Sequence, residues 1–210
     1  MIRTTLVAEG SSDQVLAQII DWTLWESGVR AELISQWADL RNLRVKPLGY
    51  PEIVQKSVEL YPCDLLFVHK DSDRESPGVR RDQINEALDG LLLPPKVTVI
   101  PVKMQEAWLL CDESAIRAAA GNPNGKARLS LPKAAAVERI ADPKQRVFEL
   151  LRIASERTGR RLQQFNVEFA RTQICQHIDD FSKLRALSSF QEFENELRTV
   201  VEAHHLDRWT

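Results

Sequence analysis

Two aspartates follow a short apolar run in the first half of the chain, and they are the residues best placed to do chemistry. Residues 65–68 have the length and composition of a strand buried on both faces. Asp71 and Asp73 come just past its end, where α/β folds place their ligands. Carboxylates at this spacing are hard oxygen donors that can share a divalent cation such as Mg²⁺. The simpler alternative is that they cap the next helix or form a turn.

Two other segments carry charged residues at corresponding positions. Glu9 follows a predicted strand at 6–8, and Lys103 and Glu106 follow a β-branched run at 97–102. The carboxyl ends of parallel strands meet at one edge of a sheet, so these side chains would share a crevice. Carboxylates gathered there repel each other unless a cation lies among them. Taken together, the segments predict a metal site, because capping alone leaves Glu9 and Glu106 unexplained.

The elements that must position these residues alternate through residue 110. Strands are predicted at 6–8, 31–35, 64–69 and 97–102, with helices ending at Gly28 and at 37–43, 51–61 and 79–91. This alternation predicts an α/β fold with a parallel, doubly wound sheet flanked by helices. Beyond it only helices are expected, at 133–140, 143–157, 161–176 and 189–204. The predicted domains are therefore an α/β core at 1–110 and an all-helical C-terminal extension at 111–210.

Composition excludes several classes of protein. The 210 residues are 43% apolar and 28% charged, which is typical of a soluble globular protein. No apolar run is long enough to span a membrane, and the N-terminus lacks the apolar stretch of a signal peptide. The three cysteines are far apart, which favours a reducing cytoplasm and argues against a cysteine-based zinc site. A cytoplasmic protein is expected.

Charge is distributed unevenly along the chain. Residues 1–110 carry 12 basic and 16 acidic side chains, whereas residues 117–161 carry 11 basic and 4 acidic ones. An acidic half followed by a basic segment suits a polyanionic partner such as nucleic acid. The candidate phosphate contacts are Arg128, Lys133, Arg160 and Arg161. An equally simple alternative is that these residues lie on solvated helix faces.

Other catalytic motifs are missing from the sequence. There is no Gly-x-x-x-x-Gly-Lys-[Ser/Thr] segment, so ATP binding through a P-loop is not expected. There is also no Gly-x-Ser-x-Gly segment and no cysteine–histidine pairing of a hydrolase. Any nucleotide-driven step would have to come from a partner.

Two sets of motifs resemble known families. Leu-Val-Ala-Glu-Gly-Ser-Ser-Asp at 6–13 and the Asp-Ser-Asp at 71–73 resemble the Toprim domain, the Mg²⁺-binding α/β module of topoisomerases, primases and overcoming-lysogenization-defect (OLD) family nucleases. That resemblance covers roughly residues 4–110. The Pro-Val-Lys-Met-Gln-Glu-Ala-Trp-Leu-Leu-Cys-Asp at 101–112 and the segment 178–193 resemble more narrowly a bacterial Toprim-like family. That family, once catalogued as of unknown function (the DUF4276 type), is often associated with ATPases in phage defence.

The resemblance implies a site and a function. It implies Mg²⁺ or Mn²⁺ as cofactor, with Glu9, Asp71 and Asp73 holding metal and Asp13 close to a second ion. It further implies that Glu106 supplies another carboxylate and that Lys103 stabilises transition-state charge. The expected function is a metal-dependent nuclease, or nuclease-like effector, acting with a partner ATPase in antiphage defence.

Several alternatives remain open. The only tyrosines, Tyr50 and Tyr61, lie outside any domain like the one that supplies a topoisomerase nucleophile, so hydrolysis is favoured over strand passage. The chief alternative is a non-catalytic Toprim-like subunit that docks on an ATPase as a sensor or scaffold. A sugar-nucleotide transferase or a haloacid-dehalogenase-type phosphatase fits less well. A homo-oligomer is compatible with any of these.

Overall fold

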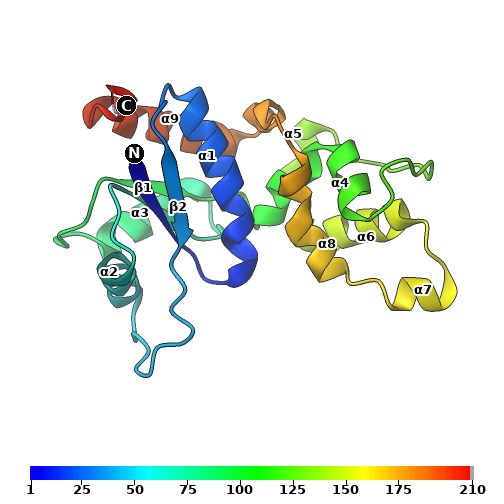
Figure 1. Ribbon diagram of the computed structural model, residues 1–210, viewed down its shortest axis with the longest axis horizontal. Coiled ribbons are helices and arrows are strands. Elements are labelled where there is room, and N and C mark those ends of the chain that lie inside the picture. The colour runs from blue at the N-terminus through cyan, green and yellow to red at the C-terminus, as the bar shows by residue number, and fades with distance from the viewer. Residues whose placement is uncertain (209–210) are drawn as a thin grey trace.

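A four-stranded parallel sheet forms one end of the molecule (Figure 1). The computed structural model describes residues 1–208. Its strands are β1 (Ile2–Val7), β2 (Leu33–Trp37), β3 (Leu65–His69) and β4 (Lys96–Val99). They lie in the order β2-β1-β3-β4, and every neighbouring pair is parallel. With the helices described next, the sheet confirms the predicted α/β fold with a helical C-terminal region.

Helices connect the strands and make up the described chain after β4. The first part contains the 3₁₀ helix η1 (Ser11–Val15) and the α-helices α1 (Leu16–Glu26), α2 (Tyr50–Leu60) and α3 (Pro77–Ala87). The second part contains η2 (Gln105–Cys111), α4 (Glu113–Ala119), α5 (Ala134–Val137), α6 (Pro143–Ser155), α7 (Gly159–Gln163), α8 (Val167–Gln173), η3 (Ile174–His177), η4 (Ser182–Ala186), α9 (Ser188–Ala203) and η5 (Leu206–Arg208). No helix within residues 1–208 is long and apolar enough to cross a membrane.

Two of the predicted helices are wrong. The segment 37–43 is not helical, because Trp37 pairs with Leu6 in the sheet and the Ala38 amide still donates to the Leu6 carbonyl at 2.9 Å. The chain then runs as a loop to α2. The segment 161–176 is not one helix but α7, α8 and η3, since Asn166 caps α8 by accepting from the Phe169 amide at 2.9 Å.

The two faces of the sheet are covered by different helices. One face packs Leu6, Phe67 and Val99 into a large core that also contains the apolar sides of α1 and α9. The other face packs Leu66 and Val68 against α2 and α3 in a smaller core. Right-handed crossovers require this arrangement, because the chain moves from β1 outward to β2 and then back across β1 to β3.

The last helix of the C-terminal region completes the α/β layer. Phe193 of α9 meets Phe67 of β3 with ring centroids 6.4 Å apart. On the edge strand β4, the Thr98 amide and hydroxyl donate to the Glu196 carboxylate of α9 at 2.9 and 2.6 Å. An edge amide that would otherwise be open to another strand is thereby paired. The predicted domain boundary at residue 110 stays a prediction. α9 lies beyond that boundary in the chain but packs on the sheet of the first part.

The order of the strands also defines where a ligand is expected. Connections leave β1 and β3 in opposite directions, so a crevice forms outside the carboxyl ends of these two central strands. Such a switch point is the usual ligand site of doubly wound sheets. Glu9 and Asp71 follow β1 and β3, respectively.

Candidate active site at the carboxyl edge of the sheet

One glutamine joins three segments of the chain at this edge. The Gln105 side-chain amide donates to Asp13 Oδ1 at 2.6 Å, and its backbone N–H donates to Asp71 Oδ1 at 2.9 Å. Asp13 follows β1, Asp71 follows β3, and Gln105 begins η2 after β4. The predicted convergence of the strand ends is therefore observed for Asp13, Asp71 and the segment containing Glu106.

Asp71 lies in an environment that opposes its negative charge. Burial, as the main cause, and the charges of Glu106, Asp13 and Asp73 together raise the pKa of Asp71 to about 7. The hydrogen bond from Gln105 acts in the opposite direction. Glu106, Asp13 and Asp73 are thus near enough to repel Asp71, which agrees with the predicted crevice for Asp71, Asp73 and Glu106 but not for Glu9.

Asp13 is the best-anchored acid of the group. Its side chain is buried and accepts from the Gly10 amide at 2.9 Å and from the Ser12 hydroxyl at 2.8 Å. With the bond from Gln105, this carboxylate has three donors, which fix its position at the start of η1. Gly10, Ser12 and Asp13 all belong to the segment on which the Toprim resemblance rests.

Glu106 is buried against a partner from the helical region. Arg171 of α8 donates to Glu106 Oε1 at 3.0 Å, and the two side chains are only 3% and 6% exposed. Burial raises the pKa of Glu106, while the positive charge of Arg171 acts to lower it. Arg171 was missed in the sequence, where nothing in its spacing or surroundings links it to an acid 65 positions earlier.

The loops after β3 and β4 hold two residues in a left-handed backbone conformation. Asp73 has φ 54° and Lys103 has φ 63°. The loops are tied together, since the Asp73 amide donates to the Lys103 carbonyl at 3.1 Å and the Lys103 amide donates to Ser72 Oγ at 2.7 Å. Residues other than glycine adopt this conformation at a cost, and such strain concentrates at functional sites. Ser72, which is fully buried, was also missed in the sequence.

The remaining predicted site residues have other partners. Lys103 donates through Nζ to the Ile140 carbonyl at 2.7 Å, which connects this loop to the helical region. Glu9 is 69% exposed and lies 3.4 Å from Lys70 Nζ. Asp73 is 64% exposed and lies 3.3 Å from Arg80 Nη2. Glu9 and Asp73 therefore lie at the solvent-exposed side of the crevice, whereas Asp13 and Glu106 are buried at its inner side.

His69, the last residue of β3, lies next to both β4 and Asp71. Its Nδ1 lies 2.8 Å from the Val99 carbonyl of β4, and its Nε2 lies 3.5 Å from Asp71 Oδ1. The ring is almost fully buried, and burial lowers its pKa. A neutral imidazole that donates from Nδ1 to the Val99 carbonyl holds β3 and β4 in register beside the aspartate that follows.

The oxygen donors of the crevice suit the predicted Mg²⁺ or Mn²⁺. Within residues 1–208 no three His, Cys, Asp or Glu side chains already form a metal cluster. Mg²⁺ seldom needs one, because it is usually held by one or two carboxylates, several waters and substrate phosphates. Asp71 is a repelled, half-buried carboxylate, and Gln105, whose backbone N–H binds it, carries a buried Oε1 with no hydrogen-bond partner in the described chain. These hard oxygen atoms fit such an ion.

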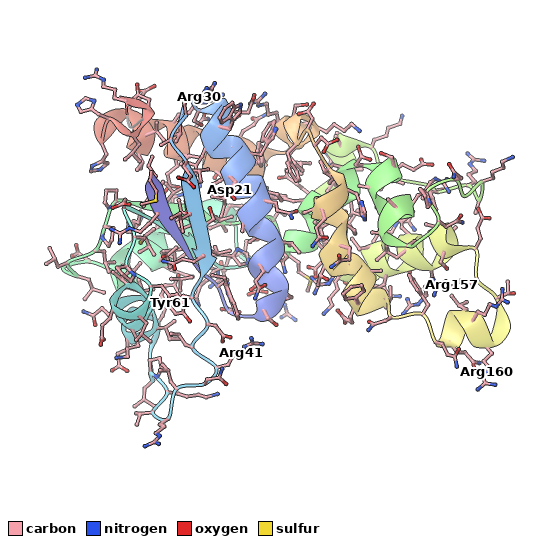
Figure 2. All side chains as sticks on the ribbon, viewed as in Figure 1. Asp21, Arg30, Arg41, Tyr61, Arg157 and Arg160 are labelled. Atoms are coloured by element: carbon pink, nitrogen blue, oxygen red, sulfur yellow. The ribbon has the colours of Figure 1, made fainter. Side chains whose placement is uncertain are left out.

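The four predicted phosphate contacts are exposed, and one of them lies far from the acidic edge. Arg128, Lys133, Arg160 and Arg161 are all exposed. Figure 2 shows Arg160 on α7 at the end of the helical region farthest from the sheet. The structure does not bring this residue to the acidic edge, so a partner that touched both would have to extend along the molecule.

Comparison of the chain with protein-family models, with curated proteins and with solved structures finds no match. The Toprim resemblance therefore rests on the motifs described above.

Proposed function

We propose that this protein is a divalent-metal-dependent phosphodiesterase that acts on nucleic acid. The observation that carries the proposal is the bridge made by Gln105 between Asp13 and Asp71 at the switch point of the sheet. This bridge brings Asp13, Asp71 and the segment that carries Glu106 together in one largely buried crevice. A fold that needed these residues only as caps would have no reason to place them together against their mutual repulsion.

The residues of the crevice have distinct roles in this proposal. Asp71 and Gln105 Oε1 would bind the ion, with Glu9 and Asp73 at its solvent side. When bound, the ion would supply Lewis acidity and a more acidic water. Asp13 and Glu106, each fixed by its own hydrogen bonds, keep the crevice negative and in place. Hydrolysis adds the oxygen of water to phosphorus and breaks the bond to one ester oxygen, which leaves with a proton.

The partner and the biological setting are part of the same proposal. They rest on the resemblance to the Toprim-like family associated with ATPases in phage defence. The chain has no P-loop of its own, so a partner would supply any ATP-driven step. The exposed helical region, with its basic residues, offers the surface for that partner or for nucleic acid.

A cleavage assay with DNA and RNA substrates, with Mg²⁺, Mn²⁺ or EDTA, tests the proposal. Asp71→Asn keeps the shape of the side chain and removes its charge, so cleavage should fall by at least about a hundredfold, the scale of one lost catalytic group. Asp89→Asn, at an exposed position beyond α3, is the matched control and should cleave normally. Equal activity of the wild type and Asp71→Asn would contradict the proposal.

One observation favours the alternative, a non-catalytic binding or sensor subunit of an ATPase complex. Both assisting residues are already engaged, because Glu106 is paired with Arg171 and Lys103 with the Ile140 carbonyl. Contacts of this kind could transmit a change in the helical region to the sheet edge. In that case Asp71→Asn would leave defence activity intact, while substitutions of exposed α6 and α8 residues would abolish assembly with the ATPase.

A further inference from the structure

A cavity of about 380 Å³ lies beside the acidic crevice, at the carboxyl ends of β1 and β3. Its walls come from the end of β1, the loop from β2 to α2, the first turns of α2 and the end of β3. Figure 2 shows Arg41, one of its lining residues, in the loop below the end of β2. The volume is within the range of about 300–1,000 Å³ that is typical of small-ligand pockets.

Two aromatic side chains with unsatisfied polar atoms line this cavity. The Trp37 indole nitrogen and the Tyr50 hydroxyl are both buried, and neither has a hydrogen-bond partner in residues 1–208. Buried polar atoms are nearly always paired, so Trp37 and Tyr50, whose side chains line the cavity, each lack a partner that a ligand group or an ordered water would supply. The rest of the wall is largely apolar, including Val7, Ala38 and Ile53. The cavity therefore suits a flat, apolar body that carries hydrogen-bonding groups at its edge.

The rim of the cavity is positively charged. Lys70 Nζ lies 4.4 Å from the centroid of the Tyr50 ring, and the Arg41 guanidinium lies 5.0 Å from that of Trp37. Lys46, exposed in the β2–α2 loop, is the third cation of the lining. Glu9 and Asp39 offset part of this charge through their contacts with Lys70 and Arg41. Cations over aromatic rings suit a ligand that combines an aromatic ring with an anionic group.

We propose that this cavity binds one nucleotide, with the base against Trp37 and Tyr50 and the phosphate at Lys46 and Lys70. Stacking of bases on aromatic side chains is strong and tolerates any sequence. Glu9 and Lys70 line the cavity and also follow the strands that carry the crevice. A nucleotide held here would direct the next phosphodiester toward Asp71. That last step rests on the proposed function, whereas nucleotide binding itself does not.

Calorimetry on the full chain in EDTA tests binding without metal. The probes are AMP, adenosine, inorganic phosphate and a five-nucleotide single strand, so that a free nucleotide and a nucleotide within a strand are distinguished. AMP or the strand should bind, and Trp37→Ala should weaken binding by about tenfold or more, since one stacking contact is lost. Trp37→Phe, which keeps a ring, should retain most of the affinity. Lys46→Glu should weaken AMP more than adenosine.

Matched controls exist elsewhere on the surface. Trp25 is 53% exposed on α1 and lies under Arg30 at 4.1 Å, the same pairing of arginine and tryptophan as in the cavity. Trp25→Ala and Lys96→Glu should bind as the wild type does. Thermal melting of every variant checks folding. Failure of the wild type to bind any nucleotide, or equal weakening by Trp25→Ala and Trp37→Ala, overturns the proposal.

Asp71→Asn separates the two proposals. It should keep nucleotide binding in EDTA and lose cleavage. If the wild type cleaves and Trp37→Ala cleaves and binds equally well, the nucleotide pocket is wrong and the phosphodiesterase stands. If nucleotides bind through Trp37 while no substrate is cleaved with any metal, the pocket stands and the phosphodiesterase is wrong.

Discussion

Gln105 and Asp13, 92 positions apart in the chain, are joined by a buried hydrogen bond of 2.6 Å. The same glutamine binds Asp71 through its backbone, so its position determines the spacing of two acids from different strands. A glutamine suits this role because its neutral amide donates to a carboxylate and leaves the negative charge in place. A lysine would neutralise that charge. Its other polar side-chain atom, Oε1, is a buried acceptor with no hydrogen-bond partner in the described chain.

Gln105→Ala should destabilise the protein and loosen the crevice. The buried Asp13 carboxylate would lose one of three donors, which costs about 1–3 kcal/mol in the free energy of unfolding. Urea denaturation measures this cost. Gln173→Ala is the control, because its side-chain amide donates only a local hydrogen bond, to the neighbouring Thr172 hydroxyl at 3.2 Å, and its loss should cost little. Equal stability of Gln105→Ala and the wild type would show that the bond does not hold the site together.

Arg171→Met should be among the most destabilising single substitutions. It leaves the buried Glu106 charge without its partner, and breaking a buried pair from one side costs about 3–5 kcal/mol. The double variant Arg171→Met/Glu106→Gln should recover most of the loss, since no buried charge remains. A double-mutant cycle by urea denaturation measures the coupling, and additive effects of the two changes would contradict it.

Asp73 should tolerate glycine better than alanine. Its backbone is left-handed, a conformation that glycine adopts freely, so Asp73→Gly should be about 1 kcal/mol more stable than Asp73→Ala. Asp82, exposed in α3, provides an opposite control, because glycine inside a helix is about 1 kcal/mol less stable than alanine. The order of stability at the two positions should therefore be reversed. The same order at both would show that Asp73 is not strained.

Glu138 should make stability depend on pH. Burial alone would raise its pKa, but the hydrogen bonds donated by Ser189 and Ser188 at the start of α9 lower it below the ordinary 4.5. A lowered carboxyl pKa stabilises the fold above the unfolded value, and this contribution disappears as pH falls through the folded value. Glu138→Ala should therefore cost about 1 kcal/mol at pH 7, as for a lost helix cap, and progressively less below pH 4.5. A constant difference from pH 7 to pH 3 would contradict this.

The sequence was informative where local pattern decides structure. The apolar run before Asp71 and the β-branched run before Lys103 predicted two strands with acids after them, and the structure has both strands as β3 and β4. Pro51 predicted the start of α2 in the same way, since proline suits the first turn of a helix. The fold class followed from the alternation of such segments.

The contacts that complete the site could not be predicted, because they join segments far apart in the chain. Arg171 reaches Glu106 only because α8 packs near η1 and against α6, which itself packs on η2, an arrangement that no local pattern encodes. The cavity beside Trp37 was missed for a related reason. A helix was predicted at 37–43, where pairing with β1 instead makes Trp37 the end of a strand and leaves the next residues as a wall of the cavity.

The closure of the sheet by α9 has a consequence for how the chain folds. Phe67 and Val97 become covered on one face only when residues 188–203 have been synthesised, because α9 packs there and Glu196 pairs with the β4 edge. Until then a nascent chain carries an apolar surface and an open strand edge, the features that promote aggregation. Folding is therefore expected to be slow, with its rate limited by contacts between α9 and strands about 100 positions earlier in the chain, and to benefit from a chaperone during synthesis.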